Sequence, residues 1–231
     1  MPVVKRMVCL ANSRKLSGRC IAGKEPPGGL PSAWIRPVSA RESHEVSEYE
    51  RQYPDGSDPC LLDIMKVPLL EARPTGYQQE NWLLDSGHSW QRVGRASWTD
   101  LQQLVDPVEA LWIDGHSTHG GCNDKVPLGL AAELRSSLRL IRVDQLVLSV
   151  FESGGAFGTP KRRVQARFRH HHATYWLWVT DPVYERAYLA KPDGDYPIGV
   201  SILTISLGEP FNDACYKLVA AILERDRQGP S

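Results

Sequence analysis

The most concentrated group of side chains that could contact a polyanion lies between Lys161 and Arg169. In this stretch Arg163, Gln165 and Arg167 alternate with apolar residues, which predicts a β-strand with one apolar face and one cationic face. The next apolar segment supplies the ring side chains Tyr175, Trp176 and Trp178. Cations beside aromatic rings suit the binding of single-stranded nucleic acid, because cations contact phosphates and ring faces stack on bases.

The two sides of the aromatic segment cannot both belong to a hydrophobic core. Trp176 and Trp178 share one side of an extended chain, whereas Tyr175, Leu177 and Val179 share the other. The pattern leaves open which side faces solvent, so all three aromatic residues stay candidate stacking residues. The alternative is a solvated strand face with both tryptophans in the core.

A second group of cations lies near the N-terminus, where Met1 to Lys24 contains six Lys or Arg and no Asp or Glu. The loop expected here offers Asn12, Ser13, Arg14, Lys15 and Arg19. Its backbone N–H groups could form an anion-binding nest, and a basic exposed hairpin tip is the alternative. Because the loop joins the first two expected strands, a position that contacts ligands in five-stranded barrels, we expect it to bind anions.

Three potential metal ligands follow each other at His-x-x-His-x-x-Cys spacing. They are His116, His119 and Cys122, with Asp124 just beyond. Imidazole and thiolate groups bind zinc, and three protein ligands would leave an open catalytic position. No second Cys or His pair follows at zinc-finger spacing, and the nearby glycines suit a tight connector loop. We therefore predict neither a metal nor another cofactor.

A nucleophile could come from Cys20, because Arg14 and Lys15 are close in sequence and positive surroundings favour the thiolate. With His116 as base and Asp124 as the group that orients it, a Cys-His-Asp arrangement can be drawn. It requires two distant segments to meet, and a buried structural cysteine is the alternative. Whether the protein is an enzyme stays open.

The triplet Glu80-Asn81-Trp82 combines a carboxylate, an amide and an indole. Asn can pair with adenine and Trp can stack on a base, but we prefer a strand end with Trp82 packed inward. The chain contains no phosphate-binding loop, dinucleotide fingerprint or nucleophile elbow.

The second half of the chain shows most clearly which elements would position these side chains. Hydrophobic patterning predicts strands at 146–151, 163–169 and 175–179, a helix at 183–189 and a strand at 202–207. The helix begins at Thr180-Asp181-Pro182, where a capping side chain precedes proline. Residues 216–223 form either a fifth strand or a terminal helix. This is the element order of a five-stranded Greek-key barrel, the OB-fold, which usually binds oligonucleotides or oligosaccharides.

The first half repeats this order less clearly. The expected strands cover 3–10, 19–22, 34–38, 61–70 and 81–84, and a short charged helix covers 46–52. The fold class is therefore mainly β with short helices (α+β), with two OB-like five-stranded barrels joined by a helical connector. We assign 1–95 to the first barrel, 96–140 to the connector, 141–224 to the second barrel and 225–231 to a flexible tail.

The connector has two helix signals. Ser97 and Asp100 are spaced as a capping box, with Asp in place of Glu. Pro127 opens a second helix, whose expected buried stripe is Leu130, Ala131 and Leu134.

Composition excludes several classes of protein. The 231 residues carry no formal net charge, which argues against non-specific coating of nucleic acid. No apolar run approaches the roughly 18 residues that a membrane span needs, so we expect no membrane partner. The N-terminus lacks the pattern of a signal peptide, and the five cysteines are an odd number. A cytoplasmic protein with reduced thiols is expected.

Several segments together resemble the bacterial dual OB-containing domain family. These are Leu10-Ala11-Asn12-Ser13-Arg14-Lys15, Gly18-Arg19-Cys20-Ile21-Ala22-Gly23, Trp34-Ile35-Arg36-Pro37-Val38-Ser39, Glu80-Asn81-Trp82 and Trp176-Leu177-Trp178-Val179-Thr180-Asp181-Pro182. The resemblance runs from about Lys5 to Glu224. It implies two OB-like barrels and a role in nucleic-acid binding or modification, in defence or genome conflict. It carries over no established catalytic residue.

These observations favour a nucleic-acid-binding protein that uses basic and aromatic barrel faces in a modification or defence system. The sequence leaves open whether the nucleic acid is DNA or RNA, and whether it is single- or double-stranded. The alternative is an enzyme that acts on nucleic acid or a nucleotide, with its site between the barrels at Arg14, Cys20, His116 and Asp124. A protein-interaction module is a third interpretation.

Overall fold

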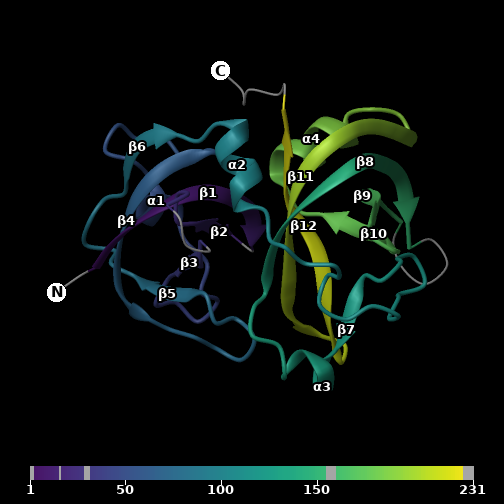
Figure 1. Cartoon of the computed structure of the whole chain (residues 1–231), viewed down its shortest axis with the longest axis horizontal. Helices are drawn as coiled ribbons and strands as arrows, with labels where there is room; N and C mark the ends of the chain where they lie inside the picture. Colours follow the sequence, from purple (N-terminus) through teal and green to yellow (C-terminus); the bar gives the residue numbers. More distant parts are fainter. Residues whose placement is uncertain (1–2, 16, 29–31, 155–159, 226–231) are drawn as a thin grey trace. The chain divides into compact units, whose positions relative to one another are not determined.

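The computed structural model describes residues 3–15, 17–28, 32–154 and 160–225 (Figure 1). These residues form two compact units. Unit 1 holds the described residues up to Leu104 together with Arg135–Ser137, and unit 2 holds Val105–Leu134 and the chain from Leu138 onward. Of the predicted tail at 225–231, all but Arg225 lies outside the described residues.

Unit 1 contains the six elements of an OB-fold. They are β1 (Val3–Lys15), β2 (Gly18–Lys24), β3 (Trp34–Val38), α1 (Glu48–Arg51), β4 (Asp63–Ala72) and β5 (Asn81–Leu84). The strands pair in the order β1-β2-β3-β5-β4, and β4 returns to β1, so the sheet closes. Among these strand pairs β3–β5 is parallel, and the other four are antiparallel. The predicted barrel and its helix position are confirmed.

The core of unit 1 forms because apolar residues alternate along its long strands. Met7 on β1 and Met65 on β4 are opposite each other and fully buried, and Ile21 and Ile35 join them from β2 and β3. At the start of α1 the Ser47 side chain and the Glu50 side chain form a complete capping box.

Two further elements of unit 1 lie outside the barrel order. β6 (Gln91–Arg95) pairs with β4, and sequence patterning does not predict it because all five of its residues are exposed. α2 (Trp98–Leu104) begins at the predicted Ser97–Asp100 capping box. Its last carbonyl, that of Leu104, accepts a 2.7 Å hydrogen bond from the buried ammonium of Lys24 on β2.

Unit 2 repeats the OB-fold with longer strands. Its elements are β7 (Lys125–Pro127), α3 (Leu128–Ala131), β8 (Leu138–Ser153), β9 (Lys161–His170), β10 (Ala173–Val179), α4 (Pro182–Leu189), β11 (Gly194–Phe211) and β12 (Ala214–Glu224). The ring runs β10-β9-β8-β11-β12 and closes through a parallel β10–β12 pair. β7 pairs with the start of β12.

The structure decides one element of unit 2 that the sequence left open, and two other elements differ from the prediction. The segment 216–223, for which a helix was an alternative, is the strand β12, because it pairs with both β11 and β10. β11 is much longer than the predicted strand 202–207. Pro197 and Gly199 interrupt the apolar alternation in the sequence, but in the structure β11 stays paired with β8 on both sides of them, with shifts in register. The helix opened by Pro127 is only four residues long, and it buries Ala131 while leaving Leu130 exposed.

α4 is capped at both ends. The Asp181 carboxylate accepts hydrogen bonds from the backbone N–H groups of Val183 and Tyr184, as the sequence predicts. At the other end, Arg162 on β9 donates to the carbonyl oxygens of Leu189 and Lys191. α4 is eight residues long, and none of the helices in the described part of the chain could cross a membrane.

Candidate nucleic-acid interface

The cationic face predicted on β9 is present in unit 2. Val164, Ala166 and Phe168 lie in the barrel core, so the intervening side chains of Arg163 and Arg167 point outward. The predicted contact residue Lys161 is exposed at the start of the same strand. The register places Arg167 opposite Trp176 on β10 and opposite Val147 on β8.

The structure decides which side of β10 faces outward. Leu177 and Val179 are buried in the core, and Trp176, with 39% of its surface exposed, lies on the outer side with the half-buried Trp178. Tyr175 does not belong to this outer surface, which corrects its selection as a stacking residue. It has no exposed surface because it alternates with Trp176 and so points into the barrel.

The outward cations lie directly against aromatic rings. The Arg163 guanidinium carbon is 5.2 Å from the Trp178 ring centroid, and that of Arg167 is 4.9 Å from the Trp176 centroid. Arg167 also lies 5.7 Å from the ring of Phe151 on β8, and the Phe151 and Trp178 rings are 5.8 Å apart. We call these five residues, Phe151, Arg163, Arg167, Trp176 and Trp178, the platform. Cations within about 6 Å of a ring are attracted by its electrons.

Phe151 is a platform residue that sequence reasoning missed. It belongs to the predicted strand 146–151, but its relation to Arg163 depends on the pairing of β8 with β9, where the two residues are opposite each other. Sequence alternation shows only that Phe151 and Leu148 point to different sides, so no local signal assigns Phe151 to a binding face.

Arg167 is held in place by polar groups as well. Its Nε donates to Gln165 Oε1 at 3.0 Å, and its guanidinium lies 3.8 Å from the carboxylate of Asp195 on β11. Gln165 is fully buried although it is on the outer side, because the segment around Gly120 lies against it and the Gly120 carbonyl accepts from its Nε2. The orientation of Arg167 therefore depends on the loop that precedes β7.

That loop, residues 114–124, is organised by its own side chains. Both carboxylate oxygens of Asp124 accept hydrogen bonds from Thr118, and Asn123 Oδ1 accepts from the N–H of Gly115. The loop then joins the sheet, because the backbone of Cys122 pairs with that of Trp176. It continues between β10 and β12, where the N–H of Lys217 donates to the Asp124 carbonyl.

The His116, His119 and Cys122 side chains do not form a ligand set. No group of three His, Cys, Asp or Glu side chains that could hold a metal ion occurs among the residues for which the structure gives positions. The Cys122 thiol instead donates to the carbonyl of Thr174, and burial raises its pKa. These three residues belong to a loop that turns back onto β10, where Cys122 contacts Thr174 and Trp176.

A buried polar cluster holds the beginning of the loop 114–124 against the inside of the barrel. The Lys217 ammonium donates to Asp114 Oδ1 at 3.1 Å and to the Ile113 carbonyl at 2.7 Å, and the Tyr175 hydroxyl donates to Asp114. Burial lowers the pKa of Lys217 and raises that of Tyr175. Sequence reasoning missed this cluster, since its members lie far apart in the chain.

In unit 1 the predicted anion-binding residues lie on a hairpin. Asn12 to Lys15 continue β1, and Arg14 is opposite Arg19 on β2. A nest of backbone N–H groups is therefore absent from Asn12–Lys15, because neighbouring N–H groups of extended chain point in opposite directions. Asn12 Nδ2 donates to the Pro59 carbonyl, and Ser13 is buried. Arg14 is exposed, and its contact with an anion stays a prediction.

Asn81 and Trp82 serve the structure of unit 1. Asn81 is buried, and its Oδ1 accepts a 2.6 Å hydrogen bond from Arg36 Nε. Arg36 also forms a buried ion pair with Glu80 at 3.1 Å, and Trp82 packs against the core. The amide that could have recognised a base is thus already paired.

The residues proposed for the enzyme alternative come from both units. Arg14 and Cys20 belong to unit 1, and His116 and Asp124 belong to unit 2. The Asp124 carboxylate is occupied by Thr118, which leaves it poorly suited to orient His116. Cys20 is half-buried on β2 opposite Ser13. All five cysteines of the chain are free thiols.

The comparisons with known proteins agree with this architecture. Searches of curated proteins and of solved structures found no match. The family model described as a dual OB-containing domain matches residues 5–222, which is nearly the whole chain, and the two closed barrels are what that description names. The chain belongs to the dual OB-containing domain family.

Proposed function

We propose that the protein binds single-stranded nucleic acid on the platform of unit 2. The observation that carries this proposal is that two outward arginines on β9 lie against the rings of Trp176, Trp178 and Phe151. Guanidinium groups can contact phosphates while exposed ring faces stack on unpaired bases. OB-folds also use the surface around their second and third strands, here β9 and β10, for oligonucleotides.

Single strands fit the platform better than duplexes. In a duplex the faces of the bases are covered by stacking, so Trp176 could not reach them without unpairing. The overall charge of the chain is zero, and the platform contains two arginines. We therefore infer binding with a small number of phosphate contacts and a modest dependence on salt.

A first prediction concerns the two platform arginines. Replacement of both, Arg163→Gln with Arg167→Gln, removes two phosphate contacts. We expect the slope of log affinity against log salt concentration to fall by roughly 1.4, at about 0.7 for each contact with a single strand. Fluorescence anisotropy with labelled single-stranded DNA and RNA at several salt concentrations measures this slope.

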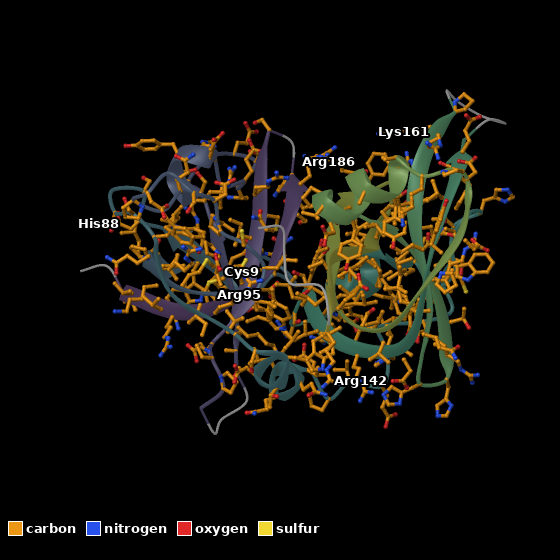
Figure 2. The ribbon with its side chains drawn as sticks, turned by 90° about the horizontal axis from the view of Figure 1, so that it is seen from above. Cys9, His88, Arg95, Arg142, Lys161 and Arg186 are labelled. Atoms are coloured by element: carbon orange, nitrogen blue, oxygen red, sulfur yellow. The ribbon has the colours of Figure 1, made fainter. Side chains whose placement is uncertain are left out.

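Arg142→Gln supplies the matched control. Arg142 is an exposed arginine of β8, it pairs with Asp144 at 3.2 Å, and it lies far from Lys161 at the opposite end of the sheet (Figure 2). Its replacement should leave affinity and slope unchanged. Equal slopes for the unchanged protein and the double variant would refute phosphate contact by Arg163 and Arg167.

A further inference from the structure

The outer face of unit 2 carries aromatic residues beyond the platform. Phe211, at the end of β11, exposes 64% of its surface. Its ring centroid is 6.2 Å from that of Tyr216 on β12. Neither residue belongs to the hydrophobic core of unit 2, so both rings are available to a ligand on the outer surface.

The register shows that these two residues share the side of the sheet that holds the platform. Cys215 and Lys217 are fully buried, which leaves Tyr216 between them pointing outward. Two residues further along β12, Leu218 is the parallel partner of Trp178. Because paired residues of neighbouring strands point to the same side and alternate residues of a strand share a side, Tyr216 points to the outer face, as Trp176 and Trp178 do.

The loop segment Cys122–Lys125 lies between Trp176 and Tyr216. Cys122 pairs with Trp176 on one side, and Lys125 pairs with Tyr216 on the other. The segment thus acts as an additional strand that separates β10 from β12 at this level. Along the curved outer wall, the path from β8 through β9, β10 and the loop segment to Tyr216 on β12 has four inter-strand steps, or roughly 19 Å at about 4.8 Å for each step.

We propose that Phe211 and Tyr216 form the far end of the binding site, so that a single strand crosses the barrel from β8 to the turn between β11 and β12. This inference rests on the proposed function and adds its footprint. Phosphates contact Arg163 and Arg167 at one end, and one base stacks on Phe211 at the other. The width fits a site of about four nucleotides or more, the lower end of what a single OB-fold covers.

The test measures the affinity of the full chain for single-stranded oligonucleotides of increasing length, from about two to about ten nucleotides. Phe211→Leu removes the ring and keeps an apolar side chain, whereas Phe211→Tyr keeps the ring. Phe211 is exposed, so both variants should fold. We expect Phe211→Leu to bind the shortest oligonucleotides like the unchanged protein and those beyond about four nucleotides roughly tenfold more weakly. Phe211→Tyr should bind all lengths like the unchanged protein.

The possible failures are distinguishable. If Phe211→Leu and the unchanged protein have the same affinity at every length, Phe211 lies outside the site and the footprint is wrong, although the platform could still bind. If the unchanged protein binds no oligonucleotide of any length, the proposed function is wrong and the footprint with it.

Discussion

Arg167 shows how much one side chain of this protein depends on its neighbours. Its guanidinium lies against the rings of Trp176 and Phe151, donates a hydrogen bond to Gln165 Oε1 and faces the carboxylate of Asp195. Asp195 is mostly exposed, so the ion pair contributes little to stability. It does place a negative charge where a phosphate would have to approach, so Asp195 competes with the ligand.

A prediction at the residue scale follows from this competition. Asp195→Asn removes the negative charge beside Arg167, and we expect the affinity for single-stranded nucleic acid to rise about two- to fivefold, since an exposed pair is worth up to about 1 kcal/mol. Asp144→Asn is the control, because Asp144 forms a comparable exposed pair with Arg142 away from the platform. Affinity that stays the same or falls in Asp195→Asn would contradict this account of Arg167.

At the scale of elements, the loop 114–124 connects the barrel interior with the outer face. Lys217 and Tyr175 hold its beginning through Asp114, and Cys122 holds its end on β10. Between these points the Gly120 carbonyl accepts from Gln165, which in turn orients Arg167. The short strand β7 and the short helix α3 follow the loop, and β7 pairs with the start of β12.

Two adjacent glycines allow this connection to be tested. A Cβ on Gly121 would lie 2.0 Å from an oxygen of Asp124, whereas a Cβ on Gly120 would meet nothing within 4 Å. We expect Gly121→Ala to destabilise unit 2 by about 1–3 kcal/mol, as overpacking does, and to weaken nucleic-acid binding. Gly120→Ala should be close to neutral for both properties. Urea unfolding and anisotropy measure the two effects, and equal behaviour of the two variants would show that the loop does not position Arg167.

At the scale of the whole molecule, stability depends on buried charge as well as on the two cores. The Lys217 side chain is fully buried, with Asp114, Tyr175, Asp124 and the Cys122 thiol as its ionisable neighbours. Burial lowers its pKa below the ordinary value of 10.5. In the interval between the folded pKa and 10.5, the folded chain binds fewer protons than the unfolded chain. This group therefore makes the free energy of unfolding rise with pH in that interval.

Lys217→Met tests this contribution because it keeps an apolar chain of similar length and has no titrating group. We expect the unchanged protein to gain stability relative to Lys217→Met as the pH rises toward 10.5. Above pH 10 the raised pKa of Tyr175 acts in the opposite direction, and it does so in both proteins. Unfolding by urea at neutral and at alkaline pH measures the difference. A stability difference that is constant with pH would mean that the Lys217 pKa is not lowered.

The sequence by itself predicted the cationic face of β9 and the element order of both barrels, with only the last element, 216–223, open between strand and helix. These depend on alternation and on helix caps, which are local, so Ser97, Asp181 and the 163–169 pattern each predict their own surroundings. The edge strand β6 was missed for the converse reason, since none of its side chains is buried.

Only the tertiary structure decided which side of β10 faces outward, and therefore that Trp176 belongs to the platform while Tyr175 is buried. It also decided that Phe151 lies beside Arg167 and that Lys217 meets Asp114. Each of these facts depends on strand register or on contacts between residues far apart in the chain. A one-residue change in register moves every side chain of a strand to the other face, and no local pattern specifies the partner strand.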